Sequence, residues 1–166
     1  VTKSPSGQNY DSNSADASYN STLLALIQRW PLRTRNSLFE RAMYQADRLQ
    51  AFAAKSDSLA VVTPSEELKQ VLKSREDDSK LITGLLGTEG SHALDGDLDN
   101  IKRLYDAGFR MMSLQHFFDN KLGGSLHGES NTGLTDFGRE AVRLMDSMGI
   151  MIDAVSYTHL TLPTNS

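Results

Sequence analysis

The sequence predicts an α/β protein built on a parallel β-sheet. From residue 59 onward, short apolar segments alternate with amphipathic helical segments in the order β-α-β-α-β-α-β. The apolar segments are continuous rather than alternating, which is typical of strands that are buried on both faces. The helical segments supply the crossover connections that parallel strands require.

The N-terminal part precedes this alternation. Residues 1–20 are rich in Ser and Asn without hydrophobic periodicity and are predicted to form a loop or frayed end. Residues 21–30 fit a short helix that a proline ends. A longer helix is predicted over residues 37–55, because Ser37 and Glu40 have the spacing of a capping box. Its expected inward face carries Leu38, Ala42, Leu49, Phe52 and Ala53.

The first two strands are predicted on either side of a helix. Residues 59–63 are too short a run for a helix and suit a buried strand. A second capping box, Thr63-Pro-Ser-Glu66, follows directly and begins the next helix. The expected inward residues of that helix are Leu68, Val71 and Leu72. Residues 80–87 are predicted to form one further strand.

The remaining elements continue the alternation. A helix over residues 98–107 precedes a strand over 109–114, and a helix over 135–148 precedes a strand that begins with residues 150–153. Each of these helices is followed by a glycine suited to a C-terminal cap. The inward residues are expected to be Leu98, Ile101, Leu104 and Tyr105, and then Phe137, Ala141, Leu144, Met145 and Met148.

Periodicity alone fits either an open doubly wound sheet or a (β/α)8 barrel. A barrel needs about 250 residues. The chain has 166 residues and so has room for about half of one.

Composition excludes several functional classes. The chain has no cysteine, which excludes disulfides and thiolate metal sites. Its formal net charge of −4 leaves no basic excess to neutralise phosphates, so no nucleic-acid partner is expected. No apolar stretch is long enough for a membrane span, and the N-terminal residues lack a signal-peptide pattern.

Polar residues follow the predicted strands, where ligands bind in both architectures. Glu89 and His92 come after the strand over 80–87, His116 follows the strand over 109–114, and Asp153 lies near the end of the last strand. Such a group is typical of a hydrolytic or metal site. Glu89 also fits a solvated loop carboxylate, and His116 also fits a hydrogen-bonded histidine of the barrel end. His127 lies in a glycine-rich segment and is expected to be exposed.

Several motifs in order carry a family resemblance. They are GTEGSHAL (87–94), DNIKRLYDAGFR (99–110), SLQHFFDN (113–120), GLTDFG (133–138) and MGIMID (148–153). The series resembles the membrane dipeptidase (renal dipeptidase) family of zinc metallopeptidases, in its bacterial branch. The resemblance is close over residues 84–153 and looser over about 20–80. It implies an amidohydrolase-like (β/α)8 TIM barrel, of which this chain would be roughly the first half without the first strand.

The resemblance also implies a chemistry. Glu89 matches the family's glutamate that bridges two zinc ions, which implies two Zn2+ per complete active site. A hydroxide held by both metals would attack the peptide bond of a dipeptide substrate. His116 matches the histidine that contacts substrate and helps stabilise the tetrahedral intermediate, with Gln115 in place of the usual Thr. For the full-length protein the resemblance allows a homodimer and export or membrane anchoring.

Other family motifs are missing. The chain contains no His-x-Asp, the family's first metal-binding motif, and the histidines of the second metal would follow Asp153. We therefore expect an internal fragment of a dipeptidase that is inactive by itself. Two alternatives stay open: a non-catalytic ligand-binding barrel relative, and another amidohydrolase acting on cyclic amides or lactones. A carbamylated lysine in place of Glu89 would have favoured other amidohydrolases.

The last residues have a different character. Residues 155–166, VSYTHLTLPTNS, resemble the translation of a transposon-derived sequencing adapter. We expect this tail to be non-native, so His159 is not considered as a site residue. Residues 1–154 are then expected to form a fragment of one barrel domain.

Overall fold

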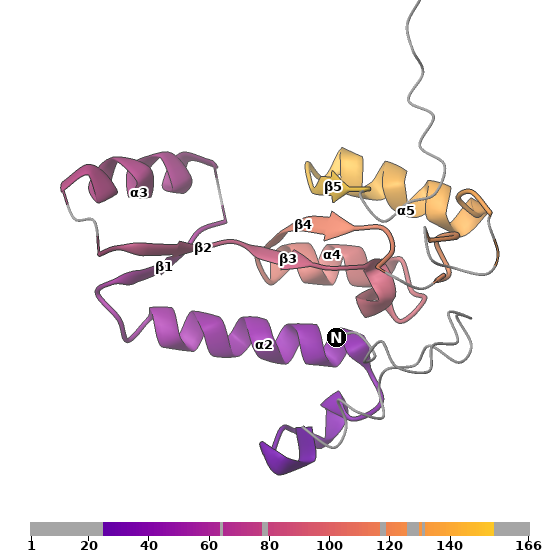
Figure 1. The fold of residues 1–166 in the computed structure, drawn as a ribbon, viewed down its shortest axis with the longest axis horizontal. Coiled ribbons are helices and arrows are strands. Elements are labelled where there is room, and N and C mark those ends of the chain that lie inside the picture. Colours follow the sequence, from indigo (N-terminus) through magenta and orange to yellow (C-terminus); the bar gives the residue numbers. More distant parts are fainter. Residues whose placement is uncertain are drawn as a thin grey trace, which may run out of the picture.

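The computed structural model describes residues 25–63, 65–77, 80–116, 119–125, 130 and 132–154. Their elements are shown in Figure 1 and are, in chain order, η1 (Leu32–Thr34), α2 (Leu38–Ala53), β1 (Leu59–Val61), α3 (Ser65–Asp77), β2 (Ile82–Gly84), β3 (Leu86–Thr88), η2 (Ser91–Leu94), α4 (Asp99–Asp106), β4 (Phe109–Ser113), α5 (Asp136–Ser147) and β5 (Met151–Asp153). Residues 25–27 are helical as well, which agrees with part of the helix predicted over 21–30.

The strands of the described residues all pair in parallel, as predicted. β1 pairs with β2 in one ladder, and β3, β4 and β5 form a second sheet in that order. The single strand predicted over 80–87 is wrong, since β2 and β3 are separate strands on either side of Leu85. The physical reason is that each half pairs with a different neighbour, and the register of β3 against β4 shifts between Leu86 and Gly87.

The core lies where α4 and α5 pack on the second sheet. Ile101 and Leu104 of α4 are fully buried, as are Met112 of β4 and Ala141 and Met145 of α5. The predicted inward faces of these two helices are therefore confirmed. The strands β4 and β5 also form close to the predicted places.

Helix α2 begins at the predicted cap. The Ser37 hydroxyl accepts a hydrogen bond from the Glu40 N–H at 2.9 Å, as a capping box requires. The predicted inward face is wrong in part, because Phe52 is 55% exposed whereas Phe39 and Arg41 are buried. Arg41 is buried because its guanidinium donates to backbone carbonyls of the preceding turn.

A distant carboxylate completes this cap. Asp95, which follows η2, accepts hydrogen bonds from the Ser37 hydroxyl at 2.5 Å and from the Leu38 N–H at 3.1 Å. A carboxylate at a helix N-terminus satisfies free N–H groups and complements the helix dipole. The contact joins residues 57 positions apart and holds the segment after β3 against α2.

Helix α3 forms as predicted, but two of the three residues of its predicted inward face are exposed, whereas Val71 is half-buried. Leu72 is 52% exposed and Leu68 is 37% exposed, so their predicted inward placement is wrong. Figure 1 shows α3 beside the β1–β2 ladder and apart from α4 and α5. Helical periodicity marks which side chains share a face, whereas burial depends on what packs against that face.

Some predictions fall outside the described residues: the loop over 1–20, the exposure of His127 and the tail over 155–166. Within the described part of the chain, no helix has the length and apolar character needed to cross a membrane.

Candidate functional site

Glu89 and His116 lie side by side at the carboxyl edge of the second sheet. Glu89 directly follows β3, and His116 comes shortly after the neighbouring parallel strand β4. The His116 Nδ1 atom is 3.6 Å from the Glu89 Oε1 atom, which is longer than a hydrogen bond. The Glu89 side chain is 78% exposed and that of His116 is 19% exposed. The structure therefore brings the two predicted site residues together and leaves the carboxylate accessible.

Gly90 allows the two segments to approach. Its φ of +89° lies in the left-handed region that favours glycine. A Cβ atom at this position would lie 3.0 Å from the His116 Cβ and 3.0 Å from the His92 Nδ1. His92, which belongs to η2, thus lies next to the same position as His116. The close approach requires the absence of a side chain here.

The segments after β3 and β4 are joined by hydrogen bonds to the end of β4. The Leu114 carbonyl accepts from the Ser91 N–H at 3.2 Å and from the Asn120 amide at 2.7 Å. The Ser91 hydroxyl donates to the Ser113 carbonyl at 2.8 Å. These contacts fix the backbone on both sides of the Glu89–His116 pair.

Asp119 organises the loop that follows His116. Its carboxylate is 7% exposed and accepts hydrogen bonds from the Ser125 N–H at 2.7 Å and the Ser130 N–H at 2.8 Å. The sequence alone predicts no role for Asp119. The glycine-rich composition of this segment indicates a turn, but no local signal indicates a partner 11 residues away.

Gln115, which directly precedes His116, is 1% exposed. Within the ranges that the structure describes, neither its Oε1 nor its Nε2 has a hydrogen-bond partner. A buried amide without a partner costs free energy, so such a position suits a water molecule or a polar group beyond these residues.

Asp153 ends the neighbouring strand β5, where it is half-buried and pairs in register with Ser113. Its backbone carbonyl accepts from the Leu114 N–H at 3.0 Å. Among the described side chains, no group of three or more His, Asp or Glu is arranged to hold a metal ion. The exposed Glu89 carboxylate has the chemistry of a metal ligand, and no further described His, Asp or Glu joins it in such a group.

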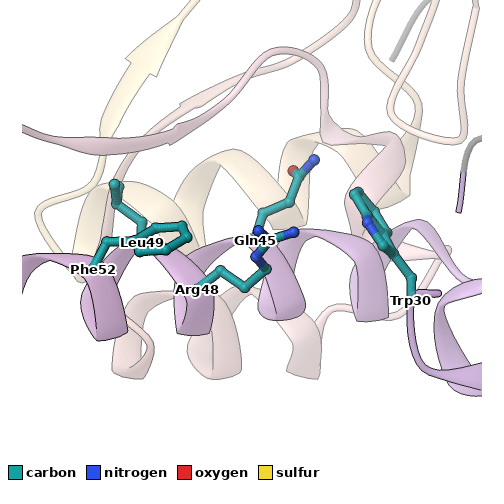
Figure 2. Close-up of a pocket in the computed structure, with 5 residues that line it drawn as sticks. All are labelled: Trp30, Gln45, Arg48, Leu49 and Phe52. Atoms are coloured by element: carbon teal, nitrogen blue, oxygen red, sulfur yellow. The ribbon is translucent and has the colours of Figure 1, made fainter. Parts of the chain in front are cut away.

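A separate pocket lies along α2. Figure 2 shows its lining side chains, which are Trp30, Gln45, Arg48, Leu49 and Phe52. Arg48 lies over the ring of Phe52, with 5.4 Å between the Cζ atom and the ring centroid. None of these residues comes from a strand end, so this pocket is separate from the Glu89–His116 pair.

Comparisons with known proteins give related sequences and structures. The sequence model of the membrane dipeptidase family (peptidase family M19) matches residues 12–163. Dipeptidase 3 of Macaca fascicularis and that of Homo sapiens are each 31% identical over 127 residues, which cover 73% of this chain and 24% of the relative. The chain thus spans about a quarter of the length of these curated relatives.

Two solved structures share the fold. A dipeptidase described as a metallopeptidase of family M19 has a TM-score of 0.59 and 20% identity, covering 70% of this chain and 34% of that one. An amidohydrolase from Pseudomonas aeruginosa has a TM-score of 0.52 and 21% identity, covering 66% of this chain and 32% of that one. The predicted fold, a partial amidohydrolase-like TIM barrel, is confirmed.

Proposed function

This chain belongs to the membrane dipeptidase family, peptidase family M19, and we propose that it supplies part of the active site of a zinc-dependent dipeptidase. The observation that carries the proposal is the juxtaposition of Glu89 and His116, 3.6 Å apart at the carboxyl ends of adjacent parallel strands. Catalytic groups of α/β barrels lie at this edge of the sheet.

Glu89 is proposed as a metal ligand. Its side chain is 78% exposed, so the carboxylate is accessible to cations, and it would bridge the two zinc ions. Zinc bound at such a site would activate water and polarise the peptide carbonyl. The described residues do not complete the coordination, so the remaining ligands would come from outside them.

His116 is proposed as the group that contacts the dipeptide. Its side chain is 19% exposed and lies next to Gly90. A largely buried imidazole beside the metal ligand would donate a hydrogen bond to the substrate oxygen on which negative charge develops. Its catalytic contribution would therefore be orientation and charge stabilisation.

The 166-residue chain alone is proposed to be inactive. Catalytic zinc sites use about three protein ligands, and the part of the chain that the structure describes does not bring three such side chains together. A non-catalytic barrel relative and an amidohydrolase acting on cyclic amides or lactones are the alternatives that an experiment has to separate.

The test compares this chain with the longer reading frame around it, obtained by a long read of the source DNA across both ends. We expect the longer protein to hydrolyse dipeptides and to lose this activity with a chelator. Glu89→Gln should lower kcat/KM by at least about 100-fold. Even substitutions of residues that only hydrogen-bond to a metal ligand lower metal affinity or activity by about 10–100-fold. Glu140→Gln, on the exposed surface of α5, is the matched control and should stay within about twofold.

Three results would contradict the proposal. The first is dipeptide hydrolysis that survives both chelation and the Glu89→Gln substitution. The second is hydrolysis of cyclic amides or lactones but not of dipeptides. The third is that the longer protein hydrolyses none of these substrates. Hydrolysis by the 166-residue chain would contradict its proposed inactivity.

We also propose, from the family resemblance alone, that the full-length protein is a homodimer. Light scattering of the longer protein tests this, and a monomer would overturn it.

A further inference from the structure

The hydroxyl of Ser113 bonds to the backbone on both sides of Glu89. Ser113 is the last residue of β4 and is 5% exposed. Its Oγ atom accepts a hydrogen bond from the Gly90 N–H and donates to the Thr88 carbonyl, with 3.2 Å between the oxygens. A serine hydroxyl has one hydrogen to donate and lone pairs to accept, so it can make both bonds at once.

These two hydrogen bonds continue the connection between β3 and β4 beyond the last residue pair of the ladder. The ladder between β3 and β4 ends at the pair Thr88 and Met112, so Glu89 lies beyond the last paired residue of its strand. The Thr88 carbonyl belongs to the peptide group before Glu89, and the Gly90 N–H belongs to the peptide group after it. When both peptide groups are held, the direction of the Glu89 Cα–Cβ bond is set as well.

The position of Glu89 has few other constraints. Its side chain is 78% exposed, so little packing holds the carboxylate in place. The Ser113 carbonyl accepts from the Ser91 hydroxyl at 2.8 Å, which holds the segment beyond Gly90 against the same residue. Ser113 therefore connects β4 to the residues before and after Glu89.

We propose that Ser113 is a positioning residue for Glu89, whose backbone it holds so that the carboxylate points to the site at the sheet edge. The inference rests on the proposed role of Glu89 as a metal ligand. Ser113 does not touch the reacting atoms in this scheme. A metal site requires ligands held within a fraction of an ångström, so loss of the hydroxyl should weaken metal binding without removing a ligand.

The first test is residue-resolved hydrogen exchange on the 166-residue chain. Ser113→Ala should accelerate exchange of the Gly90 N–H by roughly two- to tenfold, the range expected for the loss of one hydrogen bond. The amide of Leu104, in the buried helix α4, should change by less than half as much. Ser113→Thr keeps the hydroxyl and should retain the slow exchange of the Gly90 N–H. Valine has nearly the same shape as threonine but no hydroxyl, so Ser113→Val should not retain it.

The control is Ser147→Ala, which removes an exposed hydroxyl that donates to the Leu144 carbonyl at 2.8 Å. It should leave the Gly90 amide within about twofold of the parent chain. Equal acceleration at Gly90 and Leu104 in Ser113→Ala would make Ser113 a purely structural residue and overturn the proposal. If Ser113→Ala does not fold, the Thr and Val variants decide by the same comparison.

The second test measures Zn2+ affinity and kinetics in the longer protein. Ser113→Ala should weaken Zn2+ binding or lower kcat by about 10–100-fold, as for other groups that orient a metal ligand, and Ser113→Thr should recover most of it. A local change in exchange with unchanged Zn2+ affinity and kcat would overturn the positioning role. If Glu89→Gln is fully active, the proposed function is wrong. The hydrogen-exchange result at Gly90 does not depend on that activity and tests the Ser113 hydrogen bond separately.

Discussion

The loop after His116 depends on one buried carboxylate, which makes Asp119→Asn a sharp test of the structure. Asp119 is 7% exposed and accepts the N–H groups of Ser125 and Ser130 at 2.7 and 2.8 Å. Asparagine has nearly the same shape and keeps one oxygen acceptor. Its NH2 group would face a backbone N–H that then has no acceptor.

The expected loss follows from this count of hydrogen bonds. A hydrogen bond to a charged group contributes about 1.5–3 kcal/mol. Asp119→Asn removes one such bond and should lower the free energy of unfolding by that amount. Asp119→Ala removes both and should cost about twice as much. At about 2–4 °C per kcal/mol for a domain of this size, Asp119→Asn should lower Tm by about 3–12 °C.

The assay is urea and thermal unfolding followed by circular dichroism. Asp106→Asn is the matched control, because Asp106 makes an exposed ion pair with Lys102 at 2.6 Å on α4. Exposed pairs of this kind contribute about 0.3–0.5 kcal/mol. If Asp119→Asn destabilised the protein no more than Asp106→Asn, the carboxylate would not organise the loop and the reasoning would be refuted.

Two further predictions concern packing. A Cβ atom at Gly138 would lie 2.0 Å from the backbone oxygen of Leu122, so Gly138→Ala should lower Tm and cost about 1–3 kcal/mol or more. A Cβ atom at Gly84 would have its nearest neighbours at 3.9 Å, so Gly84→Ala should cost less than about 1 kcal/mol. Equal thermal shifts for the two variants would contradict the close packing of α5. Leu104→Ala should lower the free energy of unfolding, measured in urea, by about 2–5 kcal/mol because Leu104 is fully buried. Leu72 of α3 is 52% exposed, so Leu72→Ala should lower it by less than about 1 kcal/mol. Similar losses would show that the apolar face of α3 is covered.

The C-terminal half of the described fold was predictable because its signals are local. Ile101 and Leu104 recur at helical spacing, and both are buried as expected. The N-terminal cap of α5 is equally local, since the Thr135 hydroxyl accepts from the Gly138 N–H three residues later. By contrast, the periodicity of α3 predicted its apolar face correctly but not its exposure, since no periodic pattern states what covers a face.

The candidate site was likewise predictable only in part. The order of strands and helices together with the strand-end rule was enough to place Glu89 and His116 at one edge of a parallel sheet. Their 3.6 Å separation, the Ser113 hydroxyl bonded around Glu89 and the Asp95 carboxylate on the α2 N-terminus were not predictable. Each of these contacts joins segments that are far apart in the chain, and each depends on strand register and loop path. The sequence by itself therefore determined most of the elements, their order and the chemistry available, because these follow from interactions within about one turn of the chain. The division of residues 80–87 into β2 and β3 was not determined in this way, because it depends on which strands they pair with. Only the tertiary structure decided which side chains meet, because that depends on how distant segments pack together.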